Sequence, residues 1–352
     1  MSRRQMSYVV SIGLAGAMAA GCTDSTQAFS PVDVAPALSR APSAPLTIGP
    51  SPTFALATLP NGTLLAGQVP IGVVEIGSKG TTLLAALENV TGIAPNGAGN
   101  LLVITGAGES PDAAKLWRIT GNREPQLVAD LAAWEAANNP DASYNPIPDS
   151  NPFDIAALGG NRALVADAAG NDILEVDHKG NIELVALLTR QPVPFAGSPT
   201  GFIQAQPVAT SVAVGPDGTI YAGELTGFPG TPGYSRIWRI AAGSRGVTCP
   251  SSACTLLSSG LTSIVDLEIS PDGRTLYAVE LDAASWLAIE GSGGAPVAGG
   301  RVRACSTTTG VCTILESGIP LPTAVTIAKD GTPWIATNSR LFGGVTTVRP
   351  VQ

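Results

Sequence analysis

The chain has 352 residues, of which 19 are Lys or Arg, 27 are Asp or Glu and one is His, so its formal net charge is −8. An acidic chain without a basic cluster excludes nucleic acid as an expected partner. Only 13% of residues are charged, whereas 41 are Gly and 29 are Pro, a composition typical of many short strands joined by turns rather than of helices.

The first segment, residues 1–21, has the features of a lipoprotein signal peptide. Two arginines precede an apolar stretch at 8–20, which is too short to span a bilayer. The ending Ala-Ala-Gly-Cys at 19–22 resembles a bacterial lipobox, in which Cys22 is lipidated and becomes the first residue. An ordinary signal peptide cut nearby is the alternative. We therefore expect a bacterial cell-envelope protein bound to the membrane by its lipid, on the periplasmic side or at the outer membrane if the cell is Gram-negative.

Residues 22–45 are rich in Ala, Pro and Ser and predict a tether between the anchor and a folded domain at 46–352. In that domain a turn motif recurs six times. The copies are LPNG at 59–62, APNG at 94–97, LGGN at 158–161, GPDG at 215–218, SPDG at 270–273 and AKDG at 328–331.

A short apolar strand precedes each turn and another follows it, because Asn-Gly, Asp-Gly and similar pairs favour tight hairpins. After a loop of variable length comes a third strand, and in five copies a fourth. Six units of four antiparallel strands predict an all-β fold, a six-bladed β-propeller, which we expect to be monomeric.

The last copy ends with the chain and lacks its fourth strand. Residues 46–49, LTIG, precede the first copy and belong to no other blade. We expect them to pair with 345–350 as the outermost strand of the last blade and so to close the ring. The alternative is that 46–49 continues the tether.

Four cysteines remain if Cys22 carries lipid. Cys249 and Cys254 lie where a third strand turns into a fourth, and Cys305 and Cys312 lie at the same place in the next copy. We therefore predict two local disulfides, Cys249–Cys254 and Cys305–Cys312, each contributing roughly 2–2.5 kcal/mol of stability. Their spacing does not suit a redox or zinc site.

Long insertions all fall in loops that a propeller places on one face, and they carry aromatic residues. A rigid scaffold that presents such loops suits a small molecule, a glycan or a protein partner. Alternatively, the rings pack the insertions onto the blades. The predicted ligand-binding residues are Trp134, Tyr144, Phe228, Tyr234 and Trp286.

Acidic residues are expected at the same face. Asp167, Glu224 and Glu280 end second strands, while Asp154 and Asp266 stand near the start of first strands, closest to the axis. Carboxylates around one channel mouth suit Ca²⁺, which prefers oxygen ligands. The alternative is that the residues at strand ends accept backbone hydrogen bonds and hold no metal.

The stretches ALVADAAGNDILEVDHKG, PVATSVAVGPDGTIYAGELTGFPGTPGYSRIWRI and LTSIVDLEISPDGRTLYAVEL resemble the ScyD/ScyE family. This family of exported bacterial, NHL-like propellers is named after the cyanobacterial gene cluster for the pigment scytonemin. The resemblance implies a six-bladed propeller in the cell envelope and carries no catalytic residues over to this chain.

No G-x-S-x-G, HExxH or P-loop motif occurs, and the single histidine, His178, falls in a turn on the opposite face, which excludes a Ser-His-Asp triad. The sequence therefore favours a binding or scaffold module that acts through its insertion-bearing face, without deciding whether the protein is an enzyme. The alternative is a metal-assisted hydrolase or lactonase with a carboxylate ring at the channel mouth. A third hypothesis is protein–protein interaction through the rim alone.

Overall fold

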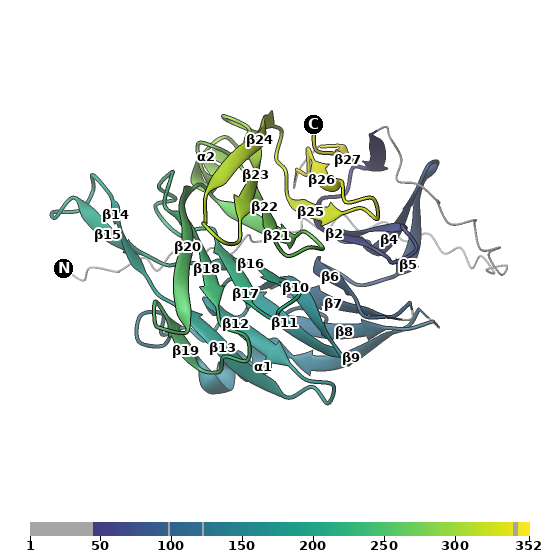
Figure 1. The fold of residues 1–352 in the computed structure, drawn as a ribbon, viewed down its shortest axis with the longest axis horizontal. Coiled ribbons are helices and arrows are strands. Elements are labelled where there is room, and N and C mark those ends of the chain that lie inside the picture. Colours follow the sequence, from purple (N-terminus) through teal and green to yellow (C-terminus); the bar gives the residue numbers. More distant parts are fainter. Residues whose placement is uncertain (1–44, 98, 122, 341–343) are drawn as a thin grey trace.

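The computed structural model describes residues 45–97, 99–121, 123–340 and 344–352, so the predicted signal peptide, Cys22 and almost all of the tether lie outside the described residues. Six main sheets of four or five strands surround a central axis, which runs toward the viewer in Figure 1. The predicted all-β, six-bladed β-propeller is confirmed.

The strands of each blade follow one another from the axis outwards. Blades 1 and 2 comprise β2 (Thr53–Thr58), β3 (Leu64–Gln68), β4 (Gly72–Gly77), β5 (Gly80–Ala85), β6 (Val90–Pro95), β7 (Leu101–Thr105), β8 (Lys115–Ile119) and β9 (Pro125–Asp130). Blades 3 and 4 comprise β10 (Pro152–Gly159), β11 (Arg162–Asp167), β12 (Asp172–Val176), β13 (Ile182–Leu188), β16 (Ala209–Val214), β17 (Ile220–Glu224), β18 (Ser235–Ile240) and β20 (Cys254–Leu261). Blades 5 and 6 comprise β21 (Ile264–Ile269), β22 (Thr275–Glu280), β23 (Gly300–Ser306), β24 (Cys312–Ile319), β25 (Ala324–Ile327), β26 (Pro333–Thr337), β27 (Thr346–Pro350) and β1 (Leu46–Gly49).

The recurrent turn motif joins the first and second strands of the blades, as predicted. In blade 4 the turn places Gly218 at φ 81°, a conformation that residues with a side chain rarely adopt. The carboxylate of Asp217 accepts the backbone N–H of Thr219 at 3.0 Å and so fixes the turn.

The hydrophobic core is divided among the interfaces between neighbouring blades. The second strands β3, β7 and β17 are buried along their whole length, so both faces of these blades are covered by their neighbours, whereas outer strands such as β5 and β24 are largely exposed. Between blades 6 and 1, for example, Ile48, Leu64 and Trp334 belong to one cluster. Similar clusters fill the other interfaces, which makes the ring a rigid support for its loops.

Ring closure occurs where the sequence predicts it. Strand β1 pairs antiparallel with β27, with Leu46 opposite Val348 and Thr47 opposite Thr347. Ile48 is 4% exposed within the cluster between blades 6 and 1. The first described strand therefore completes the last blade, and the prediction for 46–49 is confirmed.

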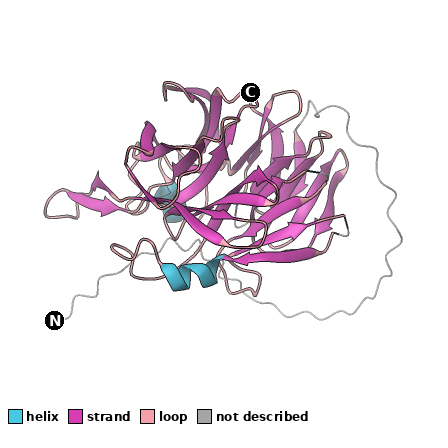
Figure 2. Cartoon of the chain, turned by 60° about the horizontal axis from the view of Figure 1, so that its bottom comes forward, coloured by secondary structure: helices cyan, strands magenta, loops and turns pink. Residues whose placement is uncertain are grey.

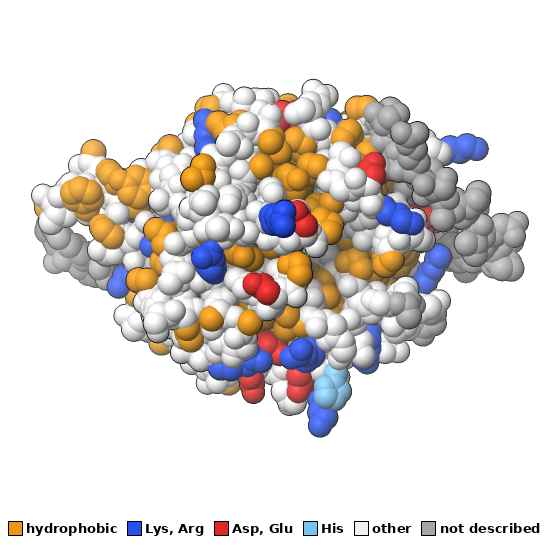
Figure 3. All heavy atoms as spheres, viewed as in Figure 1, with side chains coloured by type: hydrophobic (Ala, Val, Ile, Leu, Met, Phe, Trp, Pro, Cys, Tyr) orange, Lys and Arg blue, Asp and Glu red, His pale blue; other side chains and the backbone are white. Residues whose placement is uncertain are grey.

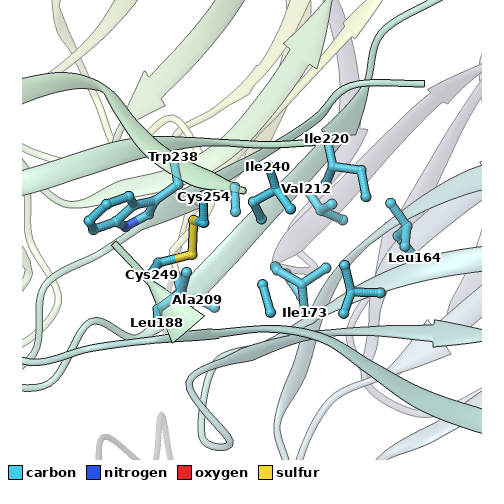
Figure 4. Close-up of a cluster of buried hydrophobic side chains, with 14 residues drawn as sticks. Leu164, Ile173, Leu188, Ala209, Val212, Ile220, Trp238, Ile240, Cys249 and Cys254 are labelled. Carbon is cyan, nitrogen blue, oxygen red and sulfur yellow. A yellow bond between two sulfur atoms is a disulfide. The ribbon is translucent and has the colours of Figure 1, made fainter. Parts of the chain in front are cut away.

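Both predicted disulfides are present, but one has an unexpected place in the fold. Cys305 and Cys312 face each other across β23 and β24 within blade 5. Cys249 instead ends β19 (Val247–Cys249), which leaves blade 4 and pairs parallel with β13 as a fifth strand of blade 3. The bond to Cys254 therefore ties the edges of blades 3 and 4 together, beside Trp238 (Figure 4).

The insertions add a few elements outside the blades. Helix α1 (Leu131–Asn138) follows β9 directly, α2 (Trp286–Gly291) follows β22, and β14 (Gln191–Pro194) pairs with β15 (Phe202–Ala205). This β14–β15 hairpin projects from the ring (Figures 1 and 2). None of the described helices is both long and apolar enough to cross a membrane.

Candidate functional site

A central channel of about 280 Å³ runs between the first strands of all six blades. Most of its lining is Ala, Val, Leu and Ile, together with three carboxylates on blades 3 and 5: Asp154, Asp266 and Glu268. Neither Lys nor Arg occurs among the described residues that line it. The channel is therefore an acidic site with aliphatic walls.

Asp154 and Asp266 occupy the same position in blades 3 and 5. In β10 and in β21 the pairing with the following strand shifts register just before this third residue, which lines the channel. Each carboxylate accepts the backbone N–H of a residue in the next blade's first strand, Val212 at 2.8 Å and Val325 at 2.6 Å respectively. These aspartates therefore connect neighbouring blades while they line the channel.

Threonines make the corresponding connections from the alternate blades. The hydroxyl of Thr91 donates to the carbonyl of Pro152 at 2.8 Å, and Thr210 donates to Ile264 at 2.7 Å. Of the threonines that line the channel, Thr91 is engaged in this bond, and Thr58 and Thr326 bond each other at 3.1 Å. The polar side chains left for a ligand are therefore chiefly the carboxylates.

Glu268 is the channel residue that the sequence analysis missed. It lies two positions beyond Asp266, and the other first strands have only small residues there: Ala57, Ala94, Ala156, Ala213 and Thr326. Aligning the six copies would have singled it out as the one long acidic side chain at that position. No hydrogen bond to its carboxylate is found within the described part of the chain.

The channel favours the neutral form of these acids. Burial raises the pKa of Glu268 to about 8, and the charge of Asp266 adds to this. Burial raises the pKa of Asp266 to about 7, against the lowering effect of its backbone hydrogen bonds. The pKa of Asp154 is also well above its usual value because of burial and the charge of Asp266. The three groups therefore form one interacting acidic set.

The other three predicted metal ligands lie outside the channel. Asp167 at the end of β11 is buried and accepts hydrogen bonds from Ser150 Oγ at 2.5 Å, Asn151 N at 2.7 Å and Gly170 N at 3.0 Å. It holds the turn between β11 and β12 together with the preceding insertion. The alternative prediction, capping of a strand end, describes this residue.

Glu224 and Glu280 each form a buried ion pair within their own blade. Arg236 binds Glu224 through both carboxylate oxygens, and Trp238 Nε1 donates to it at 3.2 Å. Arg303 Nε donates to Glu280 at 2.6 Å. The five predicted carboxylates thus do not form one ring, because only Asp154 and Asp266 face the channel.

No three His, Cys, Asp or Glu side chains in the described residues are arranged as ligands of one metal ion. On the face drawn in Figure 3, Lys and Arg lie scattered among Asp and Glu and form no continuous basic patch.

The two predicted ligand-binding tryptophans contact the protein itself. Trp286 in α2 is 8% exposed, and its Nε1 donates to the carbonyl of Thr226 at 2.9 Å. Trp134 in α1 packs half-buried against the cluster between blades 2 and 3. Both indole side chains attach an insertion to the blades. This agrees with the alternative prediction, in which the aromatic residues pack the insertions onto the blades.

Of the three other predicted aromatics, Tyr144 and Phe228 also contact other insertions. Tyr144 donates its hydroxyl to the carbonyl of Leu188 at 2.7 Å. The rings of Phe228 and Phe195 meet edge to face at 5.4 Å, and Tyr234 is half-buried. None of the five predicted aromatics lines the channel. Sequence reasoning thus located residues that organise the insertion-bearing face, while the acidic channel at its centre is the better candidate site.

No protein-family model matches the chain, and no curated protein is similar enough in sequence to count as a relative. Solved structures share its fold at low identity. A putative oxidoreductase (glucose dehydrogenase) from Thermus thermophilus is 14% identical, with 87% of this chain and 99% of that chain covered at a TM-score of 0.54. A gluconolactonase from Xanthomonas campestris is 12% identical, with coverages of 88% and 89% and a TM-score of 0.54.

The calcium-binding protein regucalcin from Agrobacterium tumefaciens is 13% identical, with coverages of 88% and 91% and a TM-score of 0.53. At such identities these likenesses show the six-bladed propeller fold alone.

Proposed function

We propose that the protein is a lipid-anchored binding module of the bacterial cell envelope that holds a small amine-bearing molecule in its central channel. The observation that supports this function is the acidic set of Asp154, Asp266 and Glu268 in a channel without a described lysine or arginine. Buried carboxylates are costly unless a cation accompanies them. A ligand ammonium group supplies that cation.

The size and walls of the channel favour a slender ligand. A volume of about 280 Å³ is at the lower end for ligand pockets, and the aliphatic side chains between the carboxylates suit methylene groups. An ammonium group binds Glu268 most readily, since Asp154 and Asp266 already accept backbone hydrogen bonds. A short alkyl amine or diamine therefore has the required chemistry.

Calorimetry with 1,4-diaminobutane tests this proposal. We expect saturable binding that strengthens between pH 6 and pH 8, because the ammonium group binds the ionised carboxylates and the pKa values of Asp266 and Glu268 lie near 7 and 8. Glu268→Gln should weaken binding about tenfold or more, which is ~1.4 kcal/mol.

The uncharged analogue 1,4-butanediol is the matched control ligand and should not bind. The exposed Glu183, whose side chain is 67% exposed, provides the control variant Glu183→Gln, which should bind as the parent does. Equal binding by the parent and by Glu268→Gln would exclude the channel as the amine site.

The proposal also includes the lipid anchor at Cys22 and membership of the ScyD/ScyE family. The lipobox-like segment at 19–22 and the resemblance to the exported ScyD/ScyE propellers support a cell-envelope location. Cys22→Ser should move the protein from the membrane fraction to the soluble fraction. Unchanged fractionation would contradict lipidation at this residue.

Lactone hydrolysis is the second candidate function. The mutually interacting Asp154 and Asp266 favour it, because a carboxyl group with a pKa near 7 can act as a general base at neutral pH. Turnover of D-glucono-1,5-lactone that rises with added divalent cation and falls at least a hundredfold in Asp266→Asn would support hydrolysis. Turnover no faster than the uncatalysed reaction would exclude this substrate.

A further inference from the structure

A second group of buried acids lies beside blade 3, away from the channel. Glu135 belongs to α1, Asp141 follows this helix, and Asp167 and Asp172 flank the turn between β11 and β12. All four are at most 1% exposed, and none lines the channel. Of the carboxylates predicted as metal ligands, only Asp167 belongs to this group.

Local structure brings these distant residues together. Asp130 caps α1 by accepting the N–H of Ala133 at 2.8 Å, which turns the chain from blade 2 toward blade 3. After the helix, Asn171 Nδ2 donates to Asp141 at 2.7 Å and connects the insertion to the β11–β12 turn. The helix, the insertion and the turn therefore enclose one small volume.

Acceptor oxygens in this volume lack donors. Both carboxylate oxygens of Glu135, both of Asp172 and one of Asp141 are buried without a hydrogen-bond partner among the described residues. None of the four acids forms an ion pair with a described lysine or arginine. Buried polar groups are nearly always satisfied, so this concentration of free acceptors requires a partner.

Gly170 marks the point on which three of the acids converge. A methyl group placed on this glycine would lie 3.4 Å from Glu135 Oε2 and 3.5 Å from Cγ of both Asp167 and Asp172. Three carboxyl groups from a helix and two strand ends therefore surround the bare backbone at this position. The absence of a side chain leaves room between them.

We propose that a calcium ion binds among Glu135, Asp141 and Asp172, beside Gly170. Calcium takes six to eight oxygen ligands in flexible geometry, which suits carboxylates from three separate segments. Magnesium needs a stricter octahedron and keeps much of its water, so this buried group selects against it.

No described lysine or arginine neutralises this group. Arg190 lies over the ring of Tyr144, 4.9 Å from its centre, and forms no ion pair with the four acids. In the described residues no three of these side chains are arranged as ligands of one ion as they stand. Binding of calcium therefore requires the carboxylates to draw together around the ion.

Thermal unfolding of the full chain in EGTA and in 1 mM CaCl₂ tests the site. We expect calcium to raise Tm by about 3–6 °C, because a ligand that binds only the folded state stabilises it. The same concentration of MgCl₂ should give less than a third of this shift. Glu135→Gln should lose most of the calcium shift, because it removes one of the carboxylates that would bind the ion.

A second variant keeps the test decisive if Glu135→Gln does not fold. Gly170→Ala fills the space between the acids without changing a charge, and its neighbours lie at ordinary contact distance, so it should fold and bind calcium at least tenfold more weakly. Gly108→Ala, whose added methyl meets nothing closer than 3.9 Å, is the matched control and should respond like the parent.

Asp266→Asn separates this site from the channel, because its calcium shift should equal that of the parent. A shift lost in Asp266→Asn but kept in Glu135→Gln would place the ion in the channel and overturn the proposal. The absence of any calcium effect on the parent would overturn it as well. The absence of a calcium effect would leave the amine proposal standing, because amine binding has its own probe and its own variant.

Discussion

The carboxylate of Asp154 in blade 3 accepts the backbone N–H of Val212 in blade 4 at 2.8 Å. This bond crosses the interface between two blades at the wall of the channel. One acidic side chain therefore serves two purposes, since it connects the ring and contributes charge to the candidate site. Asp266 and Val325 repeat the arrangement between blades 5 and 6.

Acids inside the channel should make the protein less stable as the pH rises. The pKa of Glu268 is raised from 4.5 to about 8, so the folded state binds its proton more tightly than the unfolded state does. The resulting stabilisation is complete below about pH 4.5 and is lost as the pH rises through 8. Urea unfolding at pH 5 and pH 8 should show this fall, and Glu268→Gln should reduce it by about 1–2 kcal/mol.

The control for this measurement is Glu183→Gln, which should retain the parental pH dependence because its side chain is exposed. A fall also remains in Glu268→Gln, since the pKa of Glu135 is raised to about 8 by burial elsewhere in the molecule. Parental pH dependence in Glu268→Gln would show that this carboxyl group ionises like a solvated one.

The two disulfides should contribute unequally. In the chain-entropy model each loop contributes roughly 2 kcal/mol. Cys249–Cys254 additionally holds β19 against blade 3, whereas Cys305–Cys312 only links paired strands within blade 5. Replacing the first pair by serines should therefore lower Tm more than replacing the second. Equal losses would mean that β19 stays paired without its covalent link, and non-reducing peptide mapping checks both pairings.

The repeat explains what could be predicted. Asp-Gly and Asn-Gly turns between alternating strands specify the blades, and the missing fourth strand of the last copy specifies closure by 46–49. The route of Cys249 could not be predicted, because only the packed edge of blade 3 offers β19 its partner. The sequence indicated which insertions carry the aromatic residues. It could not indicate their contacts, because these depend on how the insertions meet after folding.

The same limit applies to the acidic residues: those placed by the repeat could be predicted, and those placed by contacts made on folding could not. Asp154 and Asp266 belong to first strands, whose place at the axis follows from the repeat. Glu224 is removed from the channel by its pairing with Arg236, which depends on strand register and not on composition. The acids around Gly170 come from α1 and a strand turn far apart in the chain, so no local pattern could join them.

The buried pair of Glu224 and Arg236 should matter for stability and not for ligand binding. The side chain of Glu224 is fully buried, and removing one partner of such a pair leaves an uncompensated charge that typically costs about 3–5 kcal/mol. Glu224→Gln should lower the free energy of unfolding in this range and leave amine binding unchanged. The exposed pair of Arg245 and Glu183 is the control, since its loss should cost less than about 1 kcal/mol. If Glu224→Gln were as stable as the parent but bound the amine more weakly, Glu224 would have to be counted among the ligand-binding residues.

Ring closure should depend on one apolar side chain of β1. Ile48 is 4% exposed between blades 6 and 1, and its carbonyl accepts a hydrogen bond from Gln68 Nε2 at 3.1 Å. Ile48→Ala leaves a cavity in that interface and should lower the free energy of unfolding by about 2–4 kcal/mol in urea titrations. Thr47→Ala, on the exposed side of the same strand, is the matched control and should change stability by less than about 0.5 kcal/mol. An Ile48→Ala protein as stable as the parent would show that blade 6 holds without its N-terminal strand.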